Sequence, residues 1–322
     1  MKMMMEGQLD RQKITEIFLP TLHEALQRMD SNNLKLAHYT RFENAKLIIS
    51  GRTVWMRGSD KMNDTREITH GIEAVDYALT KYKHLTKETL SRFYVGLPAI
   101  LEKSWFDLRN RVLRDVFISC FSEHWPHETP MGRLSMWREY GKPDGVALVL
   151  NVEPFRLETN ALNAYASPVY YGGKNELANK YEEILINISD NTRELKEFSN
   201  PSHILQLMTM AILFGASCLK HSIFKEEEEW RVLHMTNIQM PTLLRKRVVP
   251  ITNETVFEIP LEDCPEKGLV GLTPDAILAN VIFGPSKRAD ENITEMIDLL
   301  RLQGVREPHL RILKSEIPLR VD

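Results

Sequence analysis

An acidic run leading into an apolar stretch is the first place in this sequence where the side chains suggest chemistry. Residues 225–231 read Lys-Glu-Glu-Glu-Glu-Trp-Arg, and Val-Leu-His-Met follows. If a strand begins at Glu229, alternation places Glu227, Glu229 and Arg231 on one face. Two crowded carboxylates at a strand start can hold a ribose hydroxyl and stabilise a cationic transition state, and they raise each other's pKa. The alternative, a solvated charged surface with Arg231 in an ion pair, remains open.

Residues 36–41, Leu-Ala-His-Tyr-Thr-Arg, place several polar groups at the end of an apolar run. His38, Tyr39 and Thr40 are therefore candidates for binding a cofactor at a strand-to-helix junction. The competing interpretation is structural. Thr40 and Glu43 match the Thr-x-x-Glu capping box of a following helix, and His38 would then be a hydrogen-bonded residue at the strand edge.

Two aromatic residues and one cysteine come next. Trp137 and Tyr140 are three positions apart in an expected helix, so they share a face. They could stack on a planar ring or simply pack in the core. Cys120 lies in the expected buried strand "VFISCF", and burial makes a thiol inert, so we do not assign it as a nucleophile.

Two further polar segments are candidate site residues. Asn63 and Asp64 precede an expected helix, where they could cap it or belong to the cofactor site. Arg245, Lys246 and Arg247 form a local basic cluster that could contact nucleic-acid phosphates.

The composition is that of an ordinary globular protein. The chain has 322 residues, is 43% hydrophobic and 26% charged, and carries a formal net charge of −3. A nucleic-acid partner would therefore need a local basic patch. The three cysteines lack metal-type spacing, and we expect reduced thiols in a cytoplasmic protein without a metal site. The most apolar stretch, 204–219, is too short to span a membrane and should form a core helix that begins at Pro201 after Asn200.

The pattern of elements predicts an α+β fold with a mixed or antiparallel central sheet, split and interrupted by helical insertions. We expect a helical N-terminal extension over 1–33 and one α+β domain of catalytic type over 34–322. No G-x-G-x-x-G and no Walker loop occur. Strands are expected at 34–39, 53–57, 116–121, 145–152, 167–171, 230–235, 255–259, 279–284 and 309–314. Helices are expected at 11–29, 43–50 (ending at Gly51), 66–83, 87–113, 134–140, 175–188, 201–219 and 290–303. Residues 236–253 should form a basic loop.

Taken in order, the motifs resemble the signature of a bacterial domain-of-unknown-function family over roughly residues 34–315. That signature consists of H-Y-T, N-D, C-F-S, M-W-x-x-Y, a G-V strand and E-x-E-[WY]-R. The matching positions are His38-Tyr39-Thr40, Asn63-Asp64, Cys120-Phe121-Ser122, Met136 to Tyr140, Gly145-Val146 and Glu227 to Arg231. The segment "VIFGP" at 281–285 also fits. One departure is Thr65, where the family more often has proline.

The stretch "LAHYTRFENAKLIISG" also resembles the opening of ADP-ribosyltransferases, especially of toxin relatives that modify nucleic acids. This resemblance implies an ADP-ribosyltransferase-like fold with NAD as substrate. His38 would bind the ribose beside the nicotinamide, and Tyr140 or Trp137 would stack on the nicotinamide ring. Arg231 is a further candidate for cofactor binding. Glu229 would be the catalytic carboxylate that stabilises the oxocarbenium-like transition state, with Glu227 as the alternate.

The resemblance implies an NAD-dependent ADP-ribosyltransferase that modifies a macromolecule, with nucleic acid favoured over protein. Such a protein would be a toxin-like or phage-defence effector, and an antitoxin or inhibitor protein is a possible partner; no membrane partner is expected. Two alternatives stay open: a non-enzymatic binding or regulatory module on the same scaffold, and a metal-dependent nuclease that uses the acidic run. In the non-enzymatic module, His38 and Glu229 would lie far apart.

Overall fold

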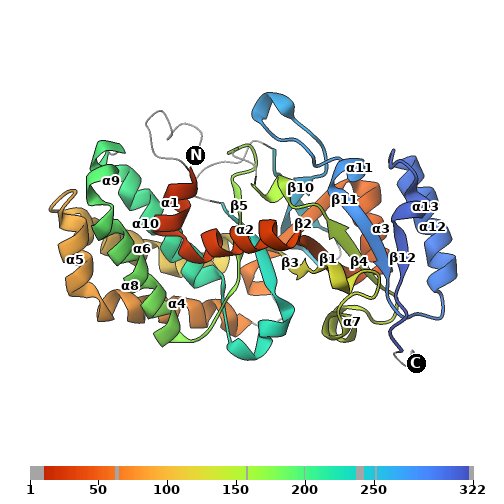
Figure 1. Cartoon of the computed structure of the whole chain (residues 1–322), viewed down its shortest axis with the longest axis horizontal. Helices are drawn as coiled ribbons and strands as arrows, with labels where there is room; N and C mark the ends of the chain where they lie inside the picture. The colour runs from red at the N-terminus through yellow and green to blue at the C-terminus, as the bar shows by residue number, and fades with distance from the viewer. Residues whose placement is uncertain are drawn as a thin grey trace.

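The computed structural model describes residues 11–61, 65–156, 159–198, 200–236, 243–250 and 252–318. Most helices gather in one half of the molecule and most strands in the other, with α2 lying between the two halves (Figure 1). The helices are α1 (Arg11–Phe18), α2 (Pro20–Asn32), α3 (Phe42–Gly51), α4 (Thr65–Lys81), α5 (Lys83–Ser91), α6 (Leu97–Asp115), α7 (Leu134–Tyr140), α8 (Lys174–Asp190), α9 (Thr192–Phe198), α10 (Pro201–Ser217), α11 (Pro274–Ile277), α12 (Ala289–Leu302) and α13 (Pro308–Arg311). The strands are β1 (Lys35–Arg41), β2 (Thr53–Gly58), β3 (Val116–His124), β4 (Gly145–Leu150), β5 (Ala164–Pro168), β6 (Tyr170–Tyr171), β7 (Leu219–Lys220), β8 (Glu229–Met235), β9 (Arg245–Val249), β10 (Glu254–Pro260), β11 (Leu278–Phe283) and β12 (Ile312–Lys314).

Within the described ranges, ten strands form one sheet that branches at β3. One edge of β3 pairs with β8, which in turn pairs with β5. The other edge is shared: residues 122–124 pair with β1, and residues 117–118 pair with β2. The β1 branch continues through β4 and β11 to β12, and the β2 branch continues through β10 to β9. Among the described strands of this sheet, only β11 and β12 pair in parallel.

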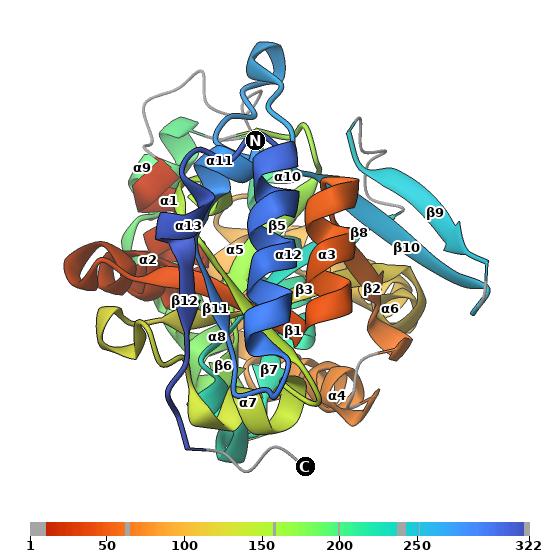
Figure 2. The same cartoon turned by 90° about the vertical axis from the view of Figure 1, so that its right-hand side faces the viewer.

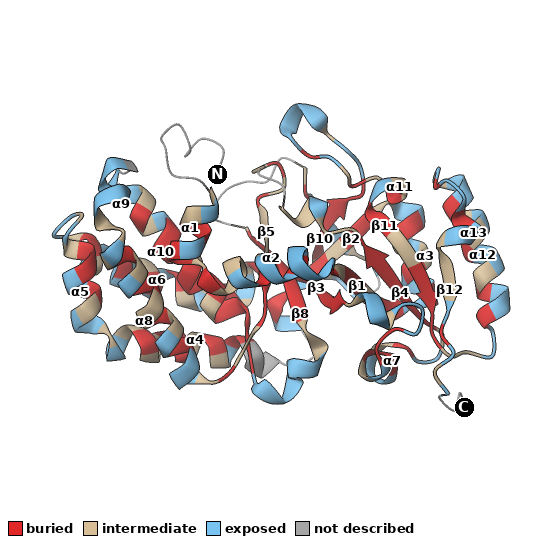
Figure 3. Cartoon of the chain, in the orientation of Figure 1, coloured by how far each residue is buried: buried red, intermediate tan, exposed pale blue. Residues whose placement is uncertain are grey.

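Alternation along β3 and β8 creates two separate cores. One face packs against the helical half, mainly α4, α6, α8 and α10; the opposite face packs beneath α3 and α12, which lie side by side (Figure 2). Buried residues accordingly concentrate in the strands and on the inward sides of the helices (Figure 3). The first core includes Val116, Ile118, Leu233 and Met235. The second includes Phe117, Phe121, Trp230 and Val232.

The predicted α+β fold with a mixed or antiparallel sheet is confirmed, and the observed sheet is mostly antiparallel. Helix α7 has the predicted bounds, and α10 begins at Pro201 with the Asn200 side chain accepting a hydrogen bond from the amide of Ser202 at 3.1 Å. Helix α10 is 17 residues long, and no helix in the described ranges is long and apolar enough to cross a membrane.

Four local predictions are wrong. The basic loop contains strand β9, which pairs along β10 at the edge of the sheet. Thr40 does not cap α3: β1 continues to Arg41, and Thr40 Oγ1 instead accepts a hydrogen bond from Asn44 Nδ2 at 3.2 Å. The predicted helix 11–29 is two helices, because Pro20 begins α2. Finally, the predicted helix 87–113 is two helices, because α5 ends at Ser91 and α6 begins at Leu97. Helix α3, in contrast, ends at Gly51 as predicted, and Arg52 follows it in the left-handed conformation at a φ of 50°.

Candidate functional site

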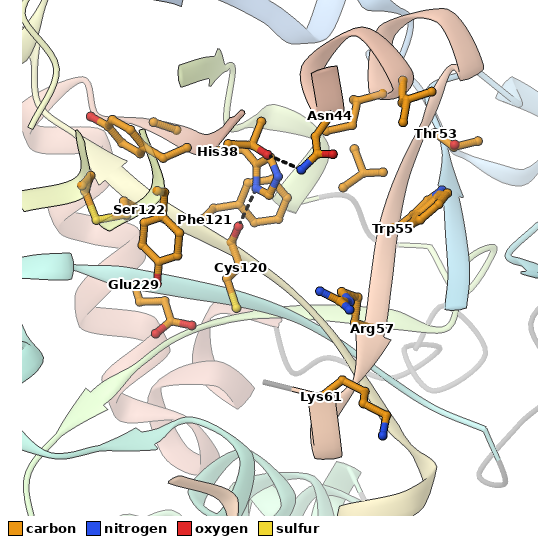
Figure 4. Close-up of a pocket in the computed structure, with 18 of the residues that line it drawn as sticks. His38, Asn44, Thr53, Trp55, Arg57, Lys61, Cys120, Phe121, Ser122 and Glu229 are labelled. Carbon is orange, nitrogen blue, oxygen red and sulfur yellow. Dashed lines mark hydrogen bonds between the residues drawn. The ribbon is translucent and has the colours of Figure 1, made fainter. Parts of the chain in front are cut away.

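A pocket of about 450 Å³ opens beside the point where the sheet branches (Figure 4). Its inner half is lined by Ala37, His38, Tyr39, Thr40, Cys120, Phe121, Ser122, Met136, Tyr140, Lys220, Glu227 and Glu229. Its outer half is lined by Asn44, Leu47, Ile48, Thr53, Val54, Trp55, Arg57, Lys61, Val249, Thr252 and Glu254. Ligand sites of this size in proteins are usually concave, largely apolar and furnished with a few polar groups, and this pocket has that character. It contains His38 and Glu229, which lie far apart in the sequence.

The branch of the sheet explains why His38 reaches this pocket. Residues 119–121 of β3 lie between its pairing with β1 and its pairing with β2. The His38 ring occupies this gap, and its Nδ1 lies 2.9 Å from the carbonyl oxygen of Cys120. A carbonyl can only accept, so Nδ1 carries the proton and Nε2 is left as an acceptor. Burial lowers the pKa of His38 despite the bond to Cys120, which keeps the ring neutral.

Glu229 lies at the inner end of the pocket, in a buried ion-pair network. Its Oε1 accepts from Arg231 Nε at 2.8 Å, and its Oε2 accepts from Lys220 Nζ at 3.1 Å. Burial alone would raise its pKa, but the neighbouring Arg231 and Lys220 cations outweigh burial and lower the pKa to about 2. Glu229 is therefore ionised at neutral pH. The predicted sharing of one face by Glu229 and Arg231 is confirmed by this contact.

Lys220 joins the two candidate carboxylates. Its Nζ donates to Glu227 at 2.8 Å as well as to Glu229. Glu227 is the less buried of the two carboxylates, with 19% of its side chain exposed against 6% for Glu229. The backbone amide of Glu229 donates to the hydroxyl of Tyr171 at 2.8 Å. The pocket thus presents two carboxylates held by one shared cation.

The segment that carries these carboxylates is clamped to the loop before α7. Arg133 donates from Nη1 to the carbonyl of Glu226 at 2.8 Å and from Nη2 to the carboxylate of Glu228 at 2.6 Å. Trp125 Nε1 donates to the same carboxylate at 2.9 Å. Glu228 adopts a left-handed conformation with a φ of 43°, which is uncommon for a residue with a side chain. These contacts fix the turn that directs its neighbours Glu227 and Glu229 into the pocket.

Of the three aromatic candidates, Tyr39 and Tyr140 line the pocket and Trp137 does not. Tyr140 lines the pocket, and burial, with Glu227 nearby, raises its pKa. Trp137 is buried: its ring meets Tyr39 edge-on at 4.9 Å, and its Nε1 donates to the carbonyl of Met131. The Tyr39 hydroxyl accepts from the amide of Arg133 at 2.9 Å, and burial raises its pKa to about 12. Tyr140 is therefore the better placed of the two predicted stacking residues.

Arg231 has a different place from the one expected of a cofactor-binding residue. Its side chain is only 1% exposed, and Nη1 donates to the carbonyl of Ser217 at 2.6 Å. Arg231 donates a hydrogen bond to the Glu229 carboxylate and does not itself line the pocket.

The predicted basic cluster lies on the outermost strand of the β2 branch, which projects from the sheet with β10 (Figure 2). Strand register and alternation put Arg245 and Arg247 on the face shared with Trp55 and Lys246 on the other face. Arg247 also pairs with Glu258 at 3.0 Å, so part of the cluster's charge is already compensated.

Asp64 and Asn63 lie outside the described residues. Sequence reasoning missed Lys220, Trp55 and Arg57. A lysine directly after the apolar run of α10 was a signal for the first, because such a lysine is expected to find an anionic partner. The Thr53-Trp55-Arg57 alternation on β2 was a signal for the others.

The comparisons with known proteins found a match to one family model. A family model described as "Protein of unknown function (DUF2971)" matches residues 136–232, the segment from α7 to β8 that contributes Tyr140, Lys220 and both carboxylates. No curated protein and no solved structure matches the chain. Among the residues that the structure describes, no group of three or more His, Cys, Asp or Glu side chains could hold a metal ion. Residues 136–232 are therefore similar to a domain-of-unknown-function family.

Proposed function

We propose that this protein is an NAD-dependent ADP-ribosyltransferase that modifies a macromolecule, with nucleic acid favoured over protein. The observation that carries the proposal is that His38 and Glu229 line one pocket. The ADP-ribosyltransferase resemblance requires these two residues to flank a ribose, and chain packing alone gives no reason for them to meet. The non-enzymatic alternative expected them to lie apart.

The geometry supports a defined division of roles. The neutral His38 presents Nε2 as an acceptor for a ribose hydroxyl, because Nδ1 is committed to Cys120. Tyr140 supplies a wall on which the nicotinamide ring can stack. The ionised Glu229 is the group that would stabilise positive charge on the ribose.

In the proposed reaction, the bond between ribose C1′ and the nicotinamide nitrogen breaks. Its electron pair leaves with the ring, which becomes neutral nicotinamide. A nucleophilic atom of the target then bonds to C1′ and loses its proton to a base. Glu227, the more exposed carboxylate, is the candidate base, with Glu229 as the alternate.

One observation favours the second candidate, a non-enzymatic module on the same scaffold. Both carboxylates already have cationic partners, since Lys220 binds Glu227 and Glu229 while Arg231 binds Glu229. Fully paired carboxylates can be structural. This candidate predicts ligand binding without any transfer.

The test combines calorimetry with a transfer assay. NAD is titrated into the protein, and labelled NAD is then incubated with the protein and with cellular RNA, DNA or protein. Our proposal predicts saturable binding and label on one class of macromolecule. Glu227→Gln and Glu229→Gln should each reduce the transfer, whereas Glu226→Gln, an exposed neighbour, should not. Binding without transfer would favour the second candidate, and no binding would refute both the proposal and any NAD-dependent role.

The favoured target class has its own test. Replacing Arg245, Lys246 and Arg247 with alanine should weaken nucleic-acid binding and flatten its salt dependence, because fewer counterions are released. The exposed pair Arg193 and Lys196 on α9 provides a matched control. An unaltered salt slope would argue against nucleic-acid binding by this strand.

A further inference from the structure

One face of β2 contributes three residues to the outer half of the pocket. Thr53, Trp55 and Arg57 alternate onto that face and all line the pocket. Leu47 and Ile48 of α3 contribute apolar surface to the same half. Figure 4 shows Trp55, Arg57 and Lys61 across the pocket from Glu229. The roles proposed above involve only the inner half and leave these groups unused.

Trp55 is held in place without being buried. Its guanidinium neighbour Arg247 lies 5.5 Å from the ring centroid, and Glu258 holds Arg247 by an ion pair at 3.0 Å. Trp55 lines the pocket, whereas Arg247 does not. The indole is thus a fixed, partly exposed aromatic surface directed into the cavity.

Arg57 adds a cation two residues along the same strand. Its Nε and Nη2 donate to the two carboxylate oxygens of Glu254 at 2.9 and 2.8 Å, which orients the guanidinium. The side chain is still 55% exposed, and a guanidinium has further N–H groups that can bind an anion. Lys61, with 54% of its side chain exposed, lines the pocket nearby.

We propose that the outer half of this pocket is a nucleotide subsite, in which a nucleobase stacks on Trp55 and its phosphate binds Arg57. An aromatic platform beside cations is the combination that proteins use to bind unpaired nucleotides, because every base has a face to stack and every phosphate a charge to pair. The side-chain amide of Asn44, which lines the pocket, can form a hydrogen bond with the edge of a base. The subsite does not depend on any transfer chemistry at the inner half.

The base could come from the adenylate half of a dinucleotide or from an unpaired residue of a nucleic acid, and two titrations separate these sources. Calorimetry is performed with AMP and with a short single-stranded oligodeoxythymidylate on the full-length protein. Trp55→Leu should weaken binding of whichever compound occupies the subsite by at least about fivefold, the lower end of what one stacked base contributes. Trp55→Phe should retain most of the affinity. Phe106→Leu, which alters an exposed aromatic on α6, should change nothing.

The phosphate contact is tested with adenosine beside AMP, or with an oligonucleotide at two salt concentrations if only the oligonucleotide binds. Arg57→Gln should abolish the preference for AMP over adenosine, or reduce the salt dependence of oligonucleotide binding. The subsite is refuted if neither AMP nor the oligonucleotide binds the wild-type protein, or if Trp55→Leu binds as the wild type does. Nicotinamide mononucleotide distinguishes the inner half, because its affinity should depend on His38 and not on Trp55. If the wild-type protein transfers nothing from NAD but still binds AMP or the oligonucleotide in a way that depends on Trp55, the proposed function is refuted. The proposal of a nucleotide subsite would then still hold.

Discussion

Nδ1 of His38 lies 2.9 Å from the carbonyl oxygen of Cys120, in the gap where β1 and β2 part along the edge of β3. This contact takes the place of a backbone hydrogen bond that a continuous sheet would make. It also fixes the tautomer that leaves Nε2 free to accept a hydrogen bond from a ligand. A structural role and a ligand-binding role therefore coincide in one side chain.

The first prediction concerns His38. His38→Ala should weaken NAD binding about tenfold, since one ligand hydrogen bond typically contributes about 1 kcal/mol and the oriented ring wall is lost with it. Calorimetry measures this change. His309→Ala, which removes an exposed histidine, serves as the control. An unchanged NAD affinity for His38→Ala would remove His38 from the binding site.

A second prediction concerns the buried pair of Glu229 and Arg231. Glu229→Gln removes the main charge that compensates the Arg231 guanidinium, whose side chain is 1% exposed. Removing one partner of a buried ion pair leaves the other charge uncompensated. This should lower the free energy of unfolding, measured by urea denaturation, by about 3–5 kcal/mol. Adding Arg231→Met should recover part of this loss. Glu226→Gln should stay within about 0.5 kcal/mol of the wild type. Equal stabilities of Glu229→Gln and wild type would contradict the buried-pair account, and a loss of transfer is interpretable only on protein shown to be folded.

A third prediction tests the clamp between Arg133 and the acidic segment. Arg133→Lys retains a positive charge but cannot reproduce donation to Glu128, Glu228 and the carbonyl of Glu226 together. Hydrogen exchange measured by mass spectrometry should therefore accelerate in residues 226–231 and in α7. Arg138→Lys, on the exposed side of the same helix, is the matched control. Unaltered protection of both segments in Arg133→Lys would show that the clamp does not position the site.

The fourth prediction is a loss of stability in mild acid. Burial lowers the pKa of His38 and His234, and it lowers that of His124 from 6.5 to about 4. Below pH 6.5 the unfolded chain therefore binds protons that the folded chain does not, so the free energy of unfolding falls as the pH decreases. Each histidine contributes a slope of up to about 1.4 kcal/mol per pH unit.

Urea denaturation at several pH values between 6.5 and 4 measures this slope. His124→Gln should flatten it, because the carboxamide does not titrate. The stabilisation from Glu229, whose pKa is about 2, should persist through most of this window and be lost only in stronger acid. A slope that His124→Gln leaves unaltered would contradict the assigned burial of that ring.

The sequence predicted the structure best where the spacing of neighbouring residues determines the conformation. Helix α7 follows from the spacing of Trp137 and Tyr140, and β8 follows from the change at Glu229 from charged to apolar residues. Strand alternation correctly predicted that Glu229 and Arg231 share one face, where their side chains form an ion pair. These features depend on the period of a helix or a strand, which neighbouring residues determine.

Features that depend on distant partners could not be predicted in the same way. The charged side chain of Arg231 suggested a role in ligand binding. Strand β8 pairs between β3 and β5, however, and this pairing buries Arg231. The charged strand β9 has no apolar pattern of its own and takes its conformation from pairing with β10. Lys220 meets Glu227 and Glu229 only because the short strand β7 brings it beneath the acidic segment.

We propose that NAD binds with its nicotinamide ribose between His38 and the carboxylates of Glu227 and Glu229. A crystal structure of the protein soaked with NAD tests it most directly. Our account predicts density for the nicotinamide riboside in the inner half of the pocket, with a ribose hydroxyl within hydrogen-bond distance of His38 Nε2 and the ring against Tyr140. An empty pocket at a saturating NAD concentration, or NAD bound elsewhere on the protein, would contradict it.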